Sequence, residues 1–302
     1  MNWPHITILG GGPAGLAAAY YARKSGMPFT LYEARHQTGG NAITLRHGDF
    51  RFDSGAHRFH DKDPEVTRDL KELLGSELVE VDAPSHVHSR SRLVEFPLTP
   101  GNLALHLGLP KTIQAAIELA VARLKPDDGR RDFESRALHM YGRTIAEAFL
   151  LNYSKKLWGL PTRQLSPGIS GSRLAHLSVG SLLRDALLGP KGGARHLEGR
   201  FLYPQDGYGE IAEALGRASG GENIRTDSPA RSIQHDGSRI QAVMFGGEPV
   251  SVQTVINTIP LPLFLRIMTP APPEEILSVA RSLRFRNIVL VALFLDQERG
   301  GA

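Results

Sequence analysis

A strand–glycine–helix–strand pattern at the start of the chain constrains the fold more than any other feature. Residues 5–9 form a short, mostly apolar segment that is followed directly by glycines, a pattern typical of a buried parallel strand. Gly10, Gly12 and Gly15 then follow the G-x-G-x-x-G spacing, and residues 16–24 are rich in alanine. This pattern predicts an α/β fold of the Rossmann type, in which the first helix points its N-terminus at a dinucleotide.

Each of these small residues has a separate physical task. Gly10 allows the tight turn out of the strand, Gly12 lets a pyrophosphate approach the backbone, and Gly15 lets the helix pack closely on the sheet. Pro13 suits the first helical turn, where a missing N–H costs nothing. Gly26 predicts a left-handed end for the helix.

An acidic residue strengthens this interpretation. The apolar residues 29–32 predict a second strand, which ends in Glu33. An acid at this place hydrogen-bonds the hydroxyls of an adenosine ribose and favours a free 2′-OH over the 2′-phosphate of NADP. The alternative is a glycine turn without a ligand, which the two strands, the intervening helix and the acid together disfavour.

The residues after Glu33 decide between cofactors. Glu33-Ala34-Arg35 leads to Gly39-Gly40-Asn41-Ala42, which resembles the E-x-x-x-x-x-G-G segment of flavoproteins of the amine oxidase and protoporphyrinogen oxidase superfamily. The resemblance implies that Arg35 and the glycine pair lie against the ribose and pyrophosphate of FAD. FAD is therefore expected rather than NAD.

A second segment of the chain supports the same resemblance. Residues 52–60 read F-D-S-G-A-H-R-F-H, and F-D-x-G-x-H resembles the amine oxidase group. The longer G-A-H-R-F-H resembles a segment of UDP-galactopyranose mutases in which the first histidine lies beside the flavin. The resemblance implies that Gly55 and Ala56 leave room for the flavin ring and that His57 is a positional candidate for a catalytic residue. His57 and His60 lack a convincing third ligand, so no metal is predicted.

The middle of the chain changes character at about residue 83. Helical patterns cover residues 111–124, 133–140 and 144–157, and this block resembles the mostly helical substrate-binding insert of the same flavoproteins. Its Y-x-x-K-x-W-G segment and the later Arg173 resemble the mutases, which implies that Trp158 contacts the substrate and that Arg173 grips a diphosphate. The alternatives are core packing for Trp158 and a solvated charge for Arg173.

The last third resembles the return of the family's chain to its flavin domain. The segment Y-P-Q-D-G-Y-G contains Tyr208, a candidate substrate contact, and the resemblance places Ala230 beside the adenine and Thr258 at the cofactor's edge. The predicted domains are residues 1–82 and 201–302 for FAD and residues 83–200 for substrate. The predicted cofactor-binding residues are Gly10, Gly12, Pro13, Ala14, Gly15, Glu33, Ala34, Arg35, Gly39, Gly40, Asn41, Ala42, Gly55, Ala56, His57, Ala230 and Thr258.

The composition of the chain excludes several kinds of cofactor and binding partner. The chain has no cysteine, which excludes disulfides, iron–sulfur clusters and a thioether-linked flavin and fits the cytoplasm. The net charge of +4 is spread along the chain, without the basic and aromatic run expected of a nucleic-acid binder. The first strand begins too early for a signal peptide, and the longest apolar run, residues 288–295, is too short to span a membrane.

Three functions remain open at this stage. The first is an FAD-dependent oxidoreductase that takes a hydride equivalent from a small molecule at flavin N5. The second is a sugar-nucleotide mutase that uses reduced FAD without net oxidation. Relatives continue beyond the strand expected at residues 287–295 and supply further flavin contacts there, so we expect this chain to be truncated. The third function is therefore a non-catalytic nucleotide-binding remnant.

Overall fold

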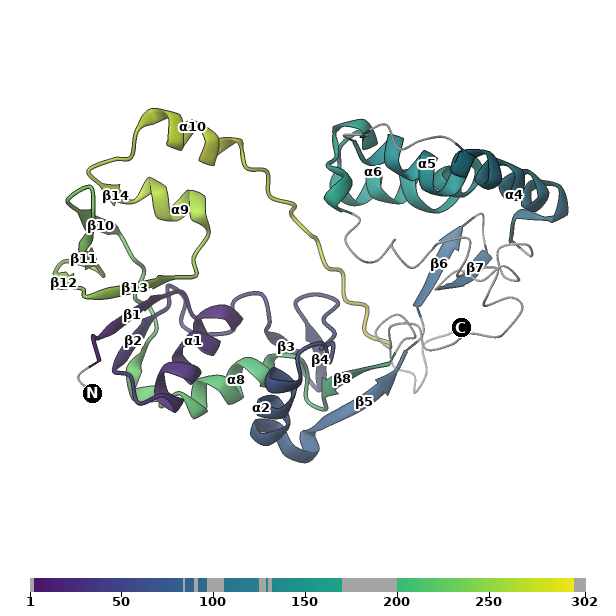
Figure 1. Ribbon diagram of the computed structural model, residues 1–302. Coiled ribbons are helices and arrows are strands. Elements are labelled where there is room, and N and C mark those ends of the chain that lie inside the picture. Colours follow the sequence, from purple (N-terminus) through teal and green to yellow (C-terminus); the bar gives the residue numbers. More distant parts are fainter. Residues whose placement is uncertain are drawn as a thin grey trace. The chain divides into compact units, whose positions relative to one another are not determined.

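The computed structural model describes residues 3–83, 85–89, 92–96, 106–124, 129, 132–169 and 200–295. The chain divides into two units, Met1–Glu80 with Leu202–Ala302, and Val81–Phe201. In Figure 1 the chain leaves the first unit along β5 (Leu78–Asp82) and returns along β8 (Arg200–Pro204), and these two strands pair.

A parallel sheet forms the centre of the first unit. Its strand order is β13 (Thr254–Asn257), β1 (Ile6–Leu9), β2 (Phe29–Tyr32) and β9 (Ile224–Arg225), and all neighbours run parallel. Every residue of β1 is buried, as a strand covered on both faces requires. The predicted α/β fold is therefore confirmed.

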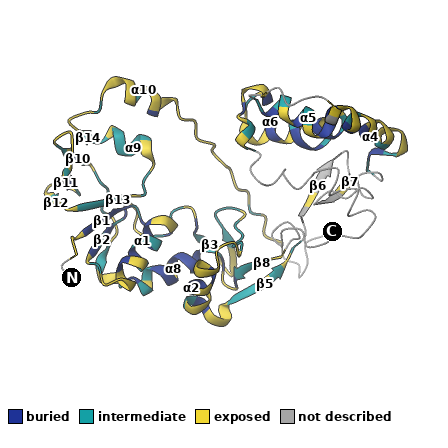
Figure 2. Ribbon diagram, viewed as in Figure 1, coloured by how far each residue is buried: buried dark blue, intermediate teal, exposed yellow. Residues whose placement is uncertain are grey.

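Helices α1 (Pro13–Lys24), α2 (Pro64–Leu74) and α8 (Gly209–Ala218) supply the apolar residues of the core beside this sheet. Figure 2 shows the buried residues along α8. The helix α1 ends before Gly26, whose φ of +68° is the left-handed conformation predicted for it. The Asp63 side chain caps α2 by accepting from two backbone N–H groups, and the short helix η1 (Gly75–Glu77) follows.

Two smaller β-structures complete the first unit. The strands β3 (Thr44–His47) and β4 (Phe50–Asp53) pair as an antiparallel hairpin. The second sheet has the order β12 (Pro249–Ser251), β11 (Ile240–Met244), β10 (Ser232–His235) and β14 (Met268–Thr269). The remaining helices of this unit are η6 (Gly221–Asn223), α9 (Leu261–Arg266) and α10 (Glu274–Ser282).

The strand predicted at residues 287–295 is wrong. No strand forms there, and most of its large apolar side chains are exposed. The apolar composition resembles that of a buried strand, but a strand also needs a neighbour that accepts and donates its backbone hydrogen bonds. None of the described residues pairs with this segment.

The second unit contains the hairpin of β6 (Ser85–Ser89) and β7 (Arg92–Phe96) and a set of packed helices. The helices are α4 (Leu109–Leu124), α5 (Phe133–Ile145), the π-helix η2 (Ala146–Leu151), α6 (Asn152–Trp158) and the short η3 (Thr162–Gln164). The helices predicted over residues 133–140 and 144–157 are separated by a kink at Gly142, whose φ of +71° and ψ of 168° are not helical. Within the described residues, no helix combines the length and the apolar character needed to cross a membrane.

Candidate dinucleotide site

The carboxyl edge of the parallel sheet collects three of the predicted cofactor residues. Leu9, the last residue of β1, lies in register with Tyr32 and Asn257 of its two neighbours. Gly10, Glu33 and Thr258 each come directly after these positions, and parallel strands present their carboxyl ends at one edge. The Thr258 hydroxyl donates to the Leu9 carbonyl at 2.8 Å, which holds β13 against the turn that follows β1.

Glu33 is anchored by backbone groups from both sides of the site. Its side chain is nearly buried, with 9% of the residue exposed. Oε2 accepts from the Gly11 N–H at 2.6 Å, and Oε1 accepts from the Arg35 N–H at 2.8 Å. A carboxylate offers about four lone-pair positions, so each oxygen retains capacity for a ribose hydroxyl. Sequence reasoning missed the contact with Gly11, because nothing local distinguishes that glycine from its neighbours.

The start of α1 is open to an anion. The N-cap residue of α1 is Gly12, which has no side chain to accept a hydrogen bond from the first N–H groups, and the first turn contains no acidic residue. The first N–H groups of a helix lack acceptors within it and carry a partial positive charge. These N–H donors lie where the G-x-G-x-x-G pattern predicts a pyrophosphate.

The glycines around this turn differ in the space beside them. A Cβ on Gly12 would approach only the Gly40 Cα, at 3.9 Å, whereas a Cβ on Gly15 would overlap the carbonyl oxygen of Gly10. Gly15 is therefore needed for packing of the protein itself. Gly12 is not, since a Cβ there would make only one ordinary van der Waals contact. The turn therefore has room beside Gly12 for a group the size of a phosphate.

The predicted glycine pair lies beside the same turn. The Gly39 N–H donates to the Gly11 carbonyl at 2.8 Å. Gly39 and Gly40 have φ values of +112° and +58°, which favour glycine. A Cβ on Gly40 would lie 3.0 Å from the Gly12 Cα. The segment after Glu33 thus folds back onto the turn that follows β1.

His57 is held beside Asn41 and Tyr208. Its Nε2 lies 2.9 Å from the Asn41 carbonyl, and its ring stacks on that of Tyr208 with centroids 4.9 Å apart and planes at 23°. A carbonyl only accepts, so Nε2 must carry the hydrogen, and in the neutral ring Nδ1 is then the acceptor. Gly55 packs under the same ring, since a Cβ there would lie 3.3 Å from Nε2.

Asp53 links the hairpin to the returning chain, and sequence reasoning missed it. Its carboxylate accepts from the Tyr203 hydroxyl, from the Tyr208 N–H at 3.0 Å and from the Thr44 hydroxyl at 2.7 Å. Burial, followed by the nearby Asp53 carboxylate, raises the pKa of Tyr203 and Tyr208 above the ordinary tyrosine range. Asp53 stands in the F-D-x-G-x-H segment, which was the available signal.

The remaining predicted residues lie in separate places. Ala34 and Arg35 are exposed beside Glu33, Asn41 and Ala56 are exposed near His57, and Ala42 is buried. Ala230 is half-buried against the core of the second sheet. Trp158 ends α6 in the other unit and is 44% exposed. Arg173 lies outside the described residues.

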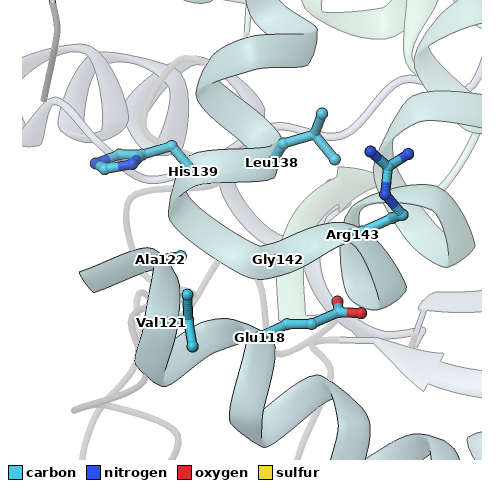
Figure 3. Close-up of a pocket in the computed structure, with 7 residues that line it drawn as sticks. All are labelled: Glu118, Val121, Ala122, Leu138, His139, Gly142 and Arg143. Carbon is cyan, nitrogen blue, oxygen red and sulfur yellow. The ribbon is translucent and has the colours of Figure 1, made fainter. Parts of the chain in front are cut away.

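A cavity of about 290 Å³ lies between α4 and α5 in the second unit. Figure 3 shows Glu118 and Val121 on α4 facing Gly142 and Arg143 on α5. Burial alone would raise the pKa of Glu118, but hydrogen bonds from Thr144 and Gln114 outweigh it, and the pKa lies below its ordinary value. The carboxylate thus stabilises the helix after the bend at Gly142, and it needs no ligand to satisfy it. Among the described residues, no three His, Asp or Glu side chains gather to bind a metal.

Comparisons with known proteins agree with this geometry. The family described as flavin containing amine oxidoreductase matches residues 13–298. The fold is similar to a reduced UDP-galactopyranose mutase, at 23% identity and a TM-score of 0.80 over 93% of this chain and 62% of that one. It is also similar to a putative protoporphyrinogen oxidase from Exiguobacterium sp. 255-15, at 22% identity and a TM-score of 0.68 over 92% of this chain and 64% of that one.

A third similar structure is a putrescine oxidase bound to putrescine, at 19% identity and a TM-score of 0.58 over 92% of this chain and 63% of that one. At these identities the likenesses show the fold alone. The chain spans 62–64% of the length of the three solved structures.

Proposed function

The chain belongs to the flavin-containing amine oxidoreductase family, and on that premise we propose that it binds FAD along the start of α1 and serves a flavin-dependent oxidation of a small molecule. Family membership confirms the resemblance inferred from the sequence and the prediction of a flavin cofactor. Bound flavin supplies a hydride acceptor for a substrate C–H bond. The substrate class and the complete reaction belong to the proposal.

The observation that carries the proposal is the contrast between Gly12 and Gly15. The protein's own packing requires a glycine at residue 15 and leaves space at residue 12. A pyrophosphate would occupy that space and accept from the N–H groups at the start of α1. Pro13, Ala14 and the pair Gly39-Gly40 line the same turn in this proposal.

The other predicted residues take roles at the two ends of the cofactor. Glu33 holds the adenosine ribose through the lone pairs that Gly11 and Arg35 leave free, with Ala34 and Ala230 toward the adenine. Asn41, Ala42, Gly55 and Ala56 border the flavin ring, and Thr258 lies at the cofactor's edge. His57 lies beside the ring. Since Nε2 is committed to the Asn41 carbonyl, only Nδ1 of His57 is available to accept a proton.

A second candidate is a sugar-nucleotide mutase that works with reduced FAD. The stacked pair of His57 and Tyr208 favours it. This contact joins the G-A-H-R-F-H segment, which resembles the mutases, to the returning Y-P-Q-D-G-Y-G segment. In this candidate Tyr208 contacts a nucleotide sugar, and the substrate roles that the resemblance implies for Trp158 and Arg173 stay predictions.

The cofactor is tested first, by absorbance and thermal unfolding of the purified full chain. We expect a yellow protein with flavin absorbance, and a melting temperature that rises with added FAD. Glu33→Ala should weaken FAD binding at least about tenfold, because the ribose loses a charge-assisted acceptor. The exposed Glu248 provides a control, and Glu248→Ala should bind FAD normally. A colourless protein whose melting temperature and FAD fluorescence do not respond would overturn the proposal.

The two reactions are then separated by anaerobic flavin spectra. Primary amines and diamines are added to the oxidised protein. In an oxidoreductase, the substrate among them reduces the flavin and bleaches its absorbance. A mutase leaves the oxidised flavin unchanged and converts UDP-galactopyranose only after reduction with dithionite. A protein that holds FAD and responds in neither assay contradicts both reactions and leaves nucleotide binding as the function.

A further inference from the structure

A network of hydrogen bonds around Asp53 joins the β3–β4 hairpin to the segment between β8 and α8. Figure 1 shows β3 and β4 beside β8 and the start of α8. The Asp53 carboxylate accepts from the Tyr203 hydroxyl and the Tyr208 N–H, which lie about 150 positions later. It also accepts from the Thr44 hydroxyl at 2.7 Å, and Thr44 Oγ1 in turn accepts from the Gly209 N–H at 2.9 Å. The hairpin thus holds the main chain at Tyr208 and at the residue after it.

The same two segments approach closely at two glycines. A Cβ on Gly207 would overlap the Thr44 side chain, and a Cβ on Gly209 would lie 2.6 Å from the Thr44 nitrogen. Both positions need glycine, because only glycine permits this approach of one backbone to another. Tyr208 stands between these two glycines, so packing and hydrogen bonds together fix the place of its Cα.

The Tyr208 ring transmits this placement to His57. Nε2 of His57 lies 2.9 Å from the Asn41 carbonyl, and this carbonyl also accepts from the Ser54 hydroxyl. A hydrogen bond at one nitrogen leaves the imidazole free to turn about the direction of that bond. The stacked Tyr208 ring, with centroids 4.9 Å apart and planes at 23°, opposes this rotation. The edge and the face of the His57 ring are therefore held by different parts of the chain.

These two contacts select one nitrogen of His57. Because the Asn41 carbonyl only accepts, Nε2 carries the hydrogen and Nδ1 is the acceptor in the neutral ring. A ring turned over about its Cβ–Cγ bond would lose the bond to Asn41 and present a carbon in place of Nδ1. Side chains that must act in one orientation are held by packing and by hydrogen bonds from the residues behind them. Tyr208 and Asp53 occupy these places behind His57.

We infer that Asp53 is a positioning residue, which fixes Tyr208 and thereby keeps the His57 ring in this orientation. That the oriented Nδ1 serves a flavin reaction rests on the proposed function, whereas the orientation itself does not. A simpler role for Asp53 would be to stabilise the hairpin in general. The two roles differ in what Asp53 does to His57 once the Tyr208 ring is removed.

The test records NMR spectra of the full chain, labelled with ¹⁵N-histidine and free of FAD, with the His57 signals assigned by their loss in His57→Gln. The wild type should show the Nε2–H tautomer and ring protons shifted by the stacked Tyr208 ring. Asp53→Ala should move these signals toward those of an exposed histidine. Asp49 is exposed in the turn of the same hairpin, and Asp49→Ala should leave them unchanged.

A double variant separates positioning from general stabilisation. Tyr208→Leu should remove the ring-induced shift of His57, whereas Tyr208→Phe should keep it. In the Tyr208→Leu background, Asp53→Ala should cause no further shift, because residues that act through one another are not additive. A shift that persists there would show that Asp53 acts on His57 through the hairpin and would overturn the inference.

A milder pair of variants covers the case in which Asp53→Ala fails to fold. Thr44→Val keeps the branched shape and removes the hydroxyl between Asp53 and the Gly209 N–H, so it should shift the His57 signals in the same direction. Thr44→Ser keeps the hydroxyl and should retain the wild-type signals. Unchanged circular dichroism will show that both variants fold. Wild-type His57 signals in a folded Thr44→Val protein would also overturn the inference.

Adding FAD to the same labelled protein tests the proposed function separately. Bound flavin beside His57 should shift its signals again. A protein that binds FAD and leaves His57 unmoved would contradict the place of His57 beside the flavin, while the variants measured without FAD still decide the role of Asp53.

Discussion

Substitutions at Gly12 and Gly15 should separate cofactor binding from protein folding. The two glycines lie in one turn and differ in the space beside them, which is open at Gly12 and filled by the Gly10 carbonyl at Gly15. We predict that Gly12→Val folds but loses FAD. Gly15→Ala should instead weaken the protein before any cofactor is added.

The magnitudes follow from the local geometry. Gly12 has φ −73° and ψ −179°, which valine adopts without strain. Valine restricts the unfolded chain by about 0.4–1 kcal/mol and is a poorer N-cap by a similar amount, so the free energy of unfolding of the apoprotein changes by less than about 1 kcal/mol. The Cβ of Gly15→Ala must displace backbone, which costs about 1–3 kcal/mol or more.

The assay is thermal unfolding with and without FAD. At a concentration of 100 times its dissociation constant, FAD stabilises the wild type by about 2.7 kcal/mol. For a chain of 302 residues this corresponds to a rise in melting temperature of about 4 °C. Gly12→Val should unfold near the wild-type apoprotein temperature and show no rise. A Gly12→Val protein that retains yellow colour through purification, or a Gly15→Ala apoprotein as stable as wild type, would refute the reasoning.

Two further predictions concern pH. Burial raises the pKa of Tyr141 to about 12 from 10.0, so the unfolded chain loses the phenol proton first as pH rises. The free energy of unfolding should therefore fall by up to about 1.4 kcal/mol per pH unit between pH 10 and 12. Tyr141→Phe should flatten this fall, measured by urea unfolding, and an unchanged slope would contradict the raised pKa. Burial, then a hydrogen bond with Glu77, raises the pKa of Glu210. The stability that this proton supplies is complete below pH 4.5, the ordinary value, and is lost as pH rises through the folded pKa. Glu210→Gln should therefore raise the melting temperature more at pH 7 than at pH 4, and equal shifts would rule this out.

The nucleotide turn was predictable because its determinants are local. Strand, turn and helix over residues 6–24 follow from residue type and spacing, and Glu33 follows from its place after the next strand. The hairpin at Thr44–His47 and Phe50–Asp53 and the cap of α2 by Asp63 were predictable for the same reason. In each case the residues that stabilise the element lie within a few positions of it.

The failures involve partners distant in sequence. The apolar residues 287–295 resemble a strand, and whether such a run pairs depends on a neighbour that the run does not specify. After the kink at Gly142 the Thr144 N–H donates to Glu118 on another helix, a contact that the local pattern does not specify. Local pattern predicts a propensity, and a distant partner decides whether it is realised.

The sequence by itself predicted the strand, glycine turn and helix over residues 6–24, since glycine spacing is a short-range property, and its resemblance to flavoproteins predicted the cofactor. Only the tertiary structure showed that Asp53 joins the hairpin to Tyr203 and Tyr208, about 150 positions later. It alone distinguished the open space at Gly12 from the filled space at Gly15. Such contacts arise when the parallel sheet and the returning chain bring segments that are remote in sequence to one edge. The spacing of residues along the chain does not specify which of these segments meet.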